Sequence, residues 1–225
     1  MNRPKYNKPA PALAPKAWGA PAPSAPRLIS RLKKLVLSPK AEWPVIAAER
    51  VTVAKLYAGY VTPLALLTAI MAFLRMTIPG TDLAFGAVLH MPTLSRLALM
   101  LMLFVSAVFC VSVVALIINA LAPTFAGQRD LRQAVKVAAY SLTPAGLSSF
   151  LALAPIPAPL LQLLAGIYGT YVLYLGLPVL MRSPQEKAFG YSASVAICTV
   201  LMGVVFVVLS TFYPGGTLYP AAQSQ

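Results

Sequence analysis

Acidic residues are scarce in this chain of 225 residues, which contains five of them and a single histidine. The five are Glu42, Glu49, Asp82, Asp130 and Glu186. All of them lie outside the long apolar runs, so those runs hold no carboxylate that could relay protons or couple ion movement. This distribution argues against an ion-coupled pump.

Residues for metal binding and nucleophilic catalysis are equally few. His90 is the only histidine, and Cys110 and Cys198 lie in apolar runs, where a free thiol behaves as a small hydrophobic group. One histidine cannot build a histidine-rich zinc or haem site. The sequence also has neither a GxSxG motif nor a glycine-rich phosphate loop. We therefore expect a protein that is not an enzyme and that needs no metal or cofactor.

Long uncharged apolar runs make up most of what is present. Hydrophobic residues account for 59% of the chain and charged residues for 10%, whereas soluble domains carry about 25% charged residues. The uncharged runs cover residues 56–74, 97–128, 137–181 and 188–225. A bilayer core of about 30 Å needs roughly 20 helical residues, so each run is long enough to cross. The third run is long enough for two crossings, and the three prolines within 155–159 interrupt it.

These runs predict an all-α polytopic membrane protein with five transmembrane helices and an N-terminal amphipathic interfacial helix. The five spans are expected at about 55–75, 97–121, 135–154, 159–181 and 190–212, which together form a transmembrane domain over 55–212. A short outer tail follows at 213–225. Thr52 is expected to cap the first span.

Positive charge is distributed very unequally between the two sides of such a bundle. Sixteen of the eighteen Lys and Arg residues fall on the side of the N-terminus, and eleven of them precede the first span. Only Arg75 and Arg96 fall on the other side. Because Lys and Arg of short loops stay in the cytoplasm, we expect a cytoplasmic N-terminus and a periplasmic or extracellular C-terminus. The net charge of +13 gathers beside apolar spans, which favours anionic lipid headgroups over nucleic acid as the counter-charge.

The segment before the first span divides into two parts. Residues 1–26 contain seven prolines and are predicted to be a disordered cytosolic tail. Residues 27–54 form an amphipathic, interfacial segment that begins RLISRLKKLVL, with an apolar stripe at helical spacing along one face. Ser38-Pro39 should end this helix and start another, and Trp43-Pro44 should interrupt the chain again.

Four basic residues near the start of this segment are the candidate contacts to lipid headgroups. They are Arg27, Arg31, Lys33 and Lys34, with Trp43 as an interfacial anchor. Alternatively, the same helix packs against the cytosolic ends of the spans.

A second candidate site consists of polar residues inside the spans. Tyr60, Asn119, Tyr140 and Tyr171 could line a polar groove for a lipid or small amphipathic ligand. The alternative interpretation is that they are helix-packing positions, as small and hydroxylated residues in membrane helices commonly are.

Several segments resemble the bacterial branch of the YIP1 family. They are LSPKAEWPVIAAE, KLYAGYVTPLA, INALAPTFAGQRDLRQAVKVAAYSLTPAGL and GLPVLMRSPQEKAFGY, and the likeness covers about residues 30–212. The resemblance implies a five-span helical fold with a cytosolic N-terminus in a bacterial inner membrane. Eukaryotic members contact prenylated Rab-type GTPases through that region, but the tail here is basic and proline-rich, so GTPase binding is not carried over.

Two functions remain open from the sequence. The first is a non-enzymatic membrane protein that acts as an interaction scaffold or local membrane organiser, with anionic lipid, a membrane-protein partner or a second copy of itself as partner. The second is a small transporter, channel or lipid-translocating protein with an uncharged pathway. Prolines 63, 144 and 178 could then mark broken helices of the kind transporters use.

Overall fold

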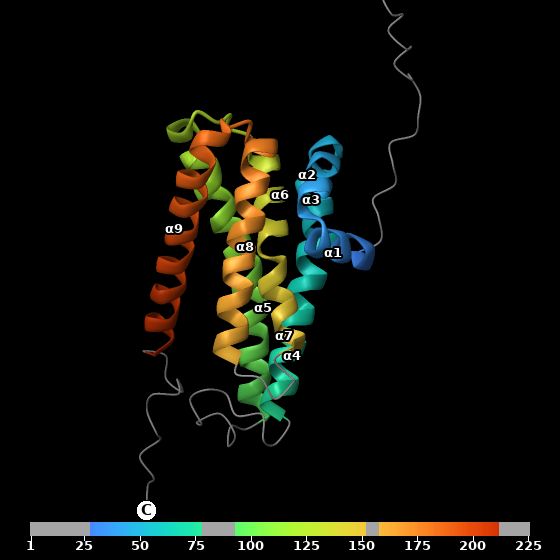
Figure 1. Cartoon of the computed structure of the whole chain (residues 1–225). Helices are drawn as coiled ribbons and strands as arrows, with labels where there is room; N and C mark the ends of the chain where they lie inside the picture. The colour runs from blue at the N-terminus through green and yellow to red at the C-terminus, as the bar shows by residue number, and fades with distance from the viewer. Residues whose placement is uncertain (1–27, 78–92, 152–157, 212–225) are drawn as a thin grey trace, which may run out of the picture.

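The structure is a computed structural model that describes residues 28–77, 93–151 and 158–211. These residues form helices joined by short turns, with no strand among them. Figure 1 shows a bundle of long, roughly parallel helices with a short helix, α1, lying across one side. The predictions for 1–26, Arg27 and 213–225 concern residues outside the described ranges.

Four helical stretches are long and apolar enough to cross a membrane. They are Val53–Arg75, Arg96–Phe125, Leu160–Met181 and Gln185–Val205. They correspond to the first, second, fourth and fifth predicted spans. The first lies in α3 (Val53–Leu56), η1 (Tyr57–Val61) and α4 (Thr62–Thr77), and the second in α5 (Thr93–Leu121) and η2 (Ala122–Phe125). The fourth lies in α8 (Ala158–Met181) and the fifth in α9 (Gln185–Thr211). The all-α membrane class predicted from the sequence is therefore confirmed.

The third predicted span, 135–154, is divided between two shorter helices. α6 (Leu131–Ser141) is capped by Leu142, and α7 (Thr143–Leu151) begins at the next residue and follows it along the bundle (Figure 1). Pro144 has no N–H to bond the carbonyl of Tyr140, so the helical ladder cannot continue unbroken through this point. Neither helix alone has the length of a bilayer crossing.

The first span begins and bends where its sequence predicts. The Thr52 hydroxyl accepts a hydrogen bond from the Lys55 amide at 3.4 Å, which confirms the predicted cap. The missing N–H of Pro63 loosens the preceding turn, where the Thr62 N–H reaches back to the Tyr57 carbonyl in a π-helical turn.

Two short helices precede the first span. α1 (Leu28–Leu37) gives way at Ser38 to α2 (Pro39–Ala48), as predicted. The predicted interruption at Trp43-Pro44 is wrong, because α2 continues through Pro44, whose ring lies on the exposed face. α2 packs along α8, and α1 crosses the side of the bundle at the level of the middle of α8 (Figure 1).

The α6–α7 pair forms the centre of the bundle, and the other helices surround it. α5 and α8 contact α6, α4 contacts α7 and α5, and α9 packs outside against α8 and α5. The outward faces are apolar: Phe109, Ile167 and Val200 are each more than half exposed. Such surfaces suit a hydrocarbon solvent and not water.

The η2 turn and the α8–α9 turn are joined to each other. The Gln128 N–H donates to the Met181 carbonyl at 2.8 Å, and the Phe125 ring stacks on Tyr191 with centroids 4.9 Å apart. A Cβ at Gly127 would lie 3.1 Å from the Met181 carbonyl oxygen, so this close approach favours glycine. The join fixes one end of the bundle.

Candidate functional site

A buried charge cluster connects the N-terminal helices to the bundle. Arg31 of α1 is 3% exposed, and its Nε lies 3.6 Å from Glu42 Oε1 of α2. Its Nη2 donates a hydrogen bond to the carboxylate of Glu49, the residue that ends α2. The guanidinium also lies over the Tyr140 ring of α6, 5.7 Å from its centroid. One arginine therefore joins three helices.

Lys136 of α6 contributes the second buried cation. Its Nζ donates to the carbonyls of Ile46 at 3.0 Å and Glu49 at 2.7 Å. These carbonyls lie at the C-terminal end of α2, where the helix itself offers no donor to them. Lys136 lies just before the uncharged run that starts at Val137, outside the four candidate spans. A cation at a helix C-terminus also matches the helix dipole.

An aromatic cluster continues from the charges into the bundle. The Trp43 and Tyr140 rings meet edge to face at 6.3 Å, and Tyr140 meets Tyr60 at 4.5 Å. The Tyr60 hydroxyl hydrogen-bonds to Thr143 Oγ1 at 2.6 Å, beside the α6–α7 break. Trp43 rests on Gly176 of α8, where an added Cβ would lie 2.5 Å from its ring. Gly176 therefore provides the space in which α2 docks.

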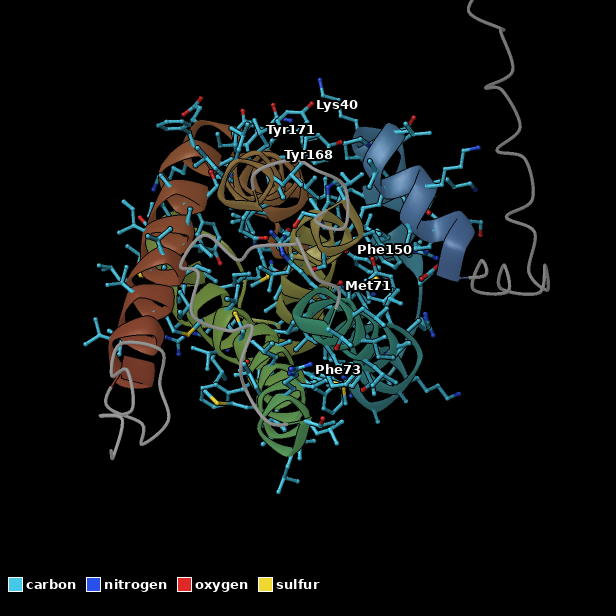
Figure 2. All side chains as sticks on the ribbon, turned by 90° about the horizontal axis from the view of Figure 1, so that it is seen from below. Lys40, Met71, Phe73, Phe150, Tyr168 and Tyr171 are labelled. Carbon is cyan, nitrogen blue, oxygen red and sulfur yellow. The ribbon has the colours of Figure 1, made fainter. Side chains whose placement is uncertain are left out.

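Tyr168 ties α1 to the middle of α8. Its hydroxyl donates to the Val36 carbonyl at 2.6 Å, near the C-terminal end of α1. Tyr168 and Tyr171 lie on the same side of α8 (Figure 2), with ring centroids 5.9 Å apart. Tyr171 is 42% exposed. The N-terminal helices are thus held at both ends of their contact with α8.

The predicted headgroup contacts divide into two groups. Lys33 and Lys34 are exposed on α1, as a headgroup contact requires. Arg31 and Trp43, however, are buried in the charge and aromatic clusters, so the prediction that they face headgroups is wrong. The reason is that Glu42 and Glu49 supply partners for Arg31 inside the fold, and Gly176 supplies a site for the indole. The alternative interpretation, that this segment packs against the bundle, describes both residues.

The four residues of the predicted polar groove do not line one cavity. Tyr60 and Tyr140 are in contact, but Tyr171 faces outward from α8. Asn119 lies near the end of α5, half-buried, and its Oδ1 has no hydrogen-bond partner within the described ranges. The predicted groove is therefore corrected to a tyrosine pair.

Exposed positive charge covers the outside of the same region. The exposed cations are Lys33, Lys34, Lys40, Arg50, Lys55, Arg129, Arg132, Arg182 and Lys187. The exposed acids in the described part of the chain are Asp130 and Glu186. Because Glu42 and Glu49 face inward, they do little to neutralise this basic surface.

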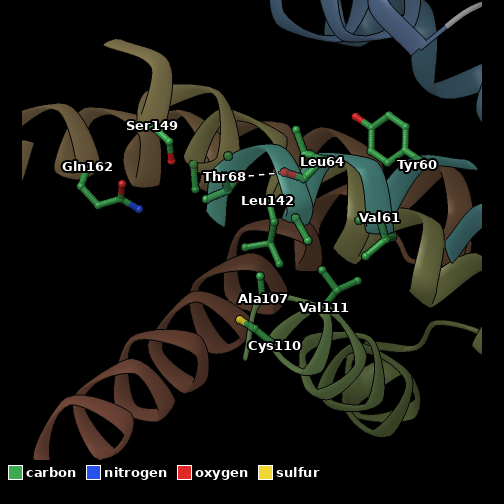
Figure 3. Close-up of a pocket in the computed structure, with 14 residues that line it drawn as sticks. Tyr60, Val61, Leu64, Thr68, Ala107, Cys110, Val111, Leu142, Ser149 and Gln162 are labelled. Atoms are coloured by element: carbon green, nitrogen blue, oxygen red, sulfur yellow. Dashed lines mark hydrogen bonds between the residues drawn. The ribbon is translucent and has the colours of Figure 1, made fainter. Parts of the chain in front are cut away.

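A cavity of about 240 Å³ lies between α4, α5, α7 and α8 (Figure 3). Tyr60 is at one end of the view and Gln162 at the other, with Cys110 of α5 on the wall between them. The Gln162 Oε1 accepts a hydrogen bond from Ser148 Oγ at 2.9 Å. All the lining residues are uncharged, so the cavity suits an apolar occupant.

The sequence reasoning missed Glu42, Glu49 and Lys136 as parts of a site. Charged residues that sit beside apolar runs are usually exposed, and the sequence signal that could have shown otherwise was only that two of five acids flank Trp43. Among the described residues there is no group of three or more His, Cys, Asp or Glu side chains that could hold a metal ion.

A helical bundle with four stretches that are long and apolar enough to cross a membrane, and with apolar outward faces, defines a polytopic membrane protein. The particular family follows from comparison: a model of the Yip1 domain matches residues 33–209, and the chain belongs to the Yip1 family. It is 28% identical over 189 residues to the inner membrane protein YohC of Escherichia coli K12, covering 83% of this chain and 97% of that protein. The YohC protein of E. coli O6:H1 matches with the same values. No solved structure matches.

Proposed function

We propose that this protein is a non-catalytic organiser of the lipid around it in a bacterial inner membrane. In this proposal, the α6–α7 pair is a fifth crossing, the N-terminus is cytoplasmic and the C-terminus is periplasmic. The separation of sixteen positive charges from two supports this orientation. The name of the relative YohC, an inner membrane protein, supports the location.

The position of α1 carries the proposal. The carbonyl of Val36 in α1 accepts a hydrogen bond from the Tyr168 hydroxyl, and Tyr168 lies thirteen residues before the end of α8 at Met181. At about 1.5 Å per residue this is about 20 Å along the helix, whereas an interfacial helix normally lies about 5–10 Å below the headgroups. Lys33 and Lys34 are exposed on this helix. Charges at such depth draw headgroups and water toward them, which thins the leaflet locally. The protein would thus indent one leaflet on one side.

Anionic headgroups are the expected occupants of that indentation. Each Lys near a lipid surface attracts anionic lipid by about 1 kcal/mol, or roughly fivefold in local enrichment. The two lysines together should therefore enrich anionic lipid beside α1 by more than tenfold. The buried Arg31 holds the helix in place and leaves both lysines free for this contact.

The test uses the full-length protein in nanodiscs of mixed zwitterionic and anionic lipid. A spin label at Leu37, which is 69% exposed, reports the depth of α1 and its contact with headgroup-labelled phosphatidylglycerol. Lys33→Gln/Lys34→Gln should reduce that contact by tenfold or more, while Lys33→Arg/Lys34→Arg should keep it. Equal contact in both variants, or a label at ordinary headgroup depth, would remove the proposal.

A pathway through the bundle is the second candidate function. The observation that favours it is a pair of cavities on either side of the α6–α7 break, which share Leu142, Ala145 and Gln162 in their walls. A break with space on both sides could let α7 move. Flux of labelled lipid or small solutes across proteoliposomes tests this function, because an organiser alone should show no flux above protein-free vesicles.

A further inference from the structure

A groove of about 550 Å³ lies between α8 and α9. Its floor is made by Val114 of α5 and by residues around the α6–α7 break, including Leu142. Two of its lining residues, Ile167 and Val200, are 61% and 65% exposed, so the groove is open to the outside of the bundle. Close-packed interiors rarely leave voids larger than a water molecule, and ligand sites have volumes of about 300–1,000 Å³. The groove is therefore large enough for a ligand.

The walls of the groove present hydrocarbon. Every lining residue is uncharged. The Thr170 hydroxyl donates to the Gly166 carbonyl at 2.9 Å, and the Thr199 hydroxyl donates to the Val195 carbonyl at 2.8 Å, so both bond within their own helices. Ser141, on the floor, is the buried hydroxyl of the lining that has no partner among the described residues. Water does not fill apolar spaces of this kind, so the occupant should itself be apolar.

Two exposed cations lie at the α8–α9 turn, and Nη1 of one of them, Arg182, donates a hydrogen bond to Gln128 Oε1 at 3.3 Å. Arg182 and Lys187 lie in and beside the α8–α9 turn. The upper lining residues, Leu173 and Val195, are nine and eight residues away from them along α8 and α9, or about 12–14 Å at 1.5 Å per residue. An acyl chain that starts below a phosphate at the turn would run along this interval first and enter the groove with its lower part.

From this combination of charge and shape we propose that the groove holds one acyl chain of an anionic phospholipid whose phosphate lies against Arg182 and Lys187. The proposal shares with the proposed function only the choice of an anionic lipid. Its site is on the α9 side of α8 and uses none of the residues of α1. The two proposals can therefore fail separately.

Gly166 offers a direct way to close the groove. Gly166 lines the groove, and a Cβ added there meets no atom within 4 Å, so a side chain can begin at this position without displacing a neighbour. Gly203 of α9 is the matched control, because its Cβ is equally free and it lies outside the lining. Gly169 is unsuitable, since a Cβ there would lie 2.7 Å from the Ser141 carbonyl oxygen.

The experiment labels the full-length protein in proteoliposomes with phosphatidylglycerol that carries a diazirine on its acyl chain. Mass spectrometry of the peptides then locates the label. We expect enrichment on residues 162–173 and 195–200, at least a tenfold loss in Gly166→Leu, and no loss in Gly203→Leu. Arg182→Gln/Lys187→Gln should lower labelling by this probe more than labelling by a phosphatidylcholine probe of the same chain. Thr199→Leu fills the groove from the opposite wall and gives a second closing variant if Gly166→Leu does not fold.

Three results would overturn the proposal. The first is label spread evenly over the exposed faces of all the spans and unchanged in both closing variants. The second is a dimer in the native protein that Gly166→Leu converts to a monomer without changing the label, because the groove would then hold a second copy of the chain. The third is equal loss in Gly166→Leu and Gly203→Leu. Lys33→Gln/Lys34→Gln should leave groove labelling unchanged, which separates this site from the lipid at α1.

Discussion

Replacing Arg31 with methionine should release α1 and α2 from the bundle. The guanidinium is 3% exposed and interacts with both Glu42 and Glu49. Unit charges about 4 Å apart interact by about 4 kcal/mol at an effective dielectric constant near 20. Removal of one partner from a buried pair costs about 3–5 kcal/mol, because the remaining charge stays buried. Lys136 cannot substitute, since its Nζ bonds to backbone carbonyls.

A loss of about 4 kcal/mol corresponds to roughly a thousandfold change in the opening equilibrium of the segment. Hydrogen exchange of the α1 and α2 amides measures that opening directly. Arg31→Met should reduce their protection by up to this factor and leave α5 unchanged, while Lys33→Met on the exposed face of the same helix should change little. If protection in Arg31→Met stayed within threefold of the unsubstituted protein, the charge cluster would not be what holds the segment.

Three further predictions concern other parts of the site. Gly176→Ala puts a methyl group where the Trp43 ring lies, 2.5 Å from it, so in a Trp18→Phe background the tryptophan emission should shift to the red. Tyr60→Phe removes one buried hydrogen bond and should lower the free energy of unfolding by about 1 kcal/mol in a denaturation series, whereas Tyr171→Phe, at an exposed position, should change it by less than about 0.5 kcal/mol. A C-terminal reporter should be active in the periplasm, and activity in the cytoplasm would contradict five crossings.

The long spans could be predicted because their signal is one of composition. α5, α8 and α9 are apolar over more than twenty residues, so the charged residues that flank each apolar run mark where its membrane helix begins and ends. The α6–α7 division was harder, since Pro144 alone does not say whether neighbouring groups will bridge the break and keep one helix. In the structure, the chain restarts as a separate helix at Thr143.

The direction of individual side chains could not be read from the pattern. The helical spacing places Arg31 on the polar face of α1. Its partners, however, lie eleven and eighteen residues further along the chain, and no local rule pairs residues at that distance. Tyr171 was misplaced for a related reason. α8 is apolar on all sides, so its sequence does not mark which face meets the bundle.

The bond between Val36 and Tyr168 joins residues 132 positions apart, and it has a consequence for the order of assembly. The contacts that α1 and α2 need on α6 and α8 do not exist until the ribosome has passed Gly176. At about 5–20 residues per second, the N-terminal helices wait roughly 6–26 seconds after their own synthesis. During that interval the basic segment is free to lie on the membrane surface, and it can dock only after α8 has been made.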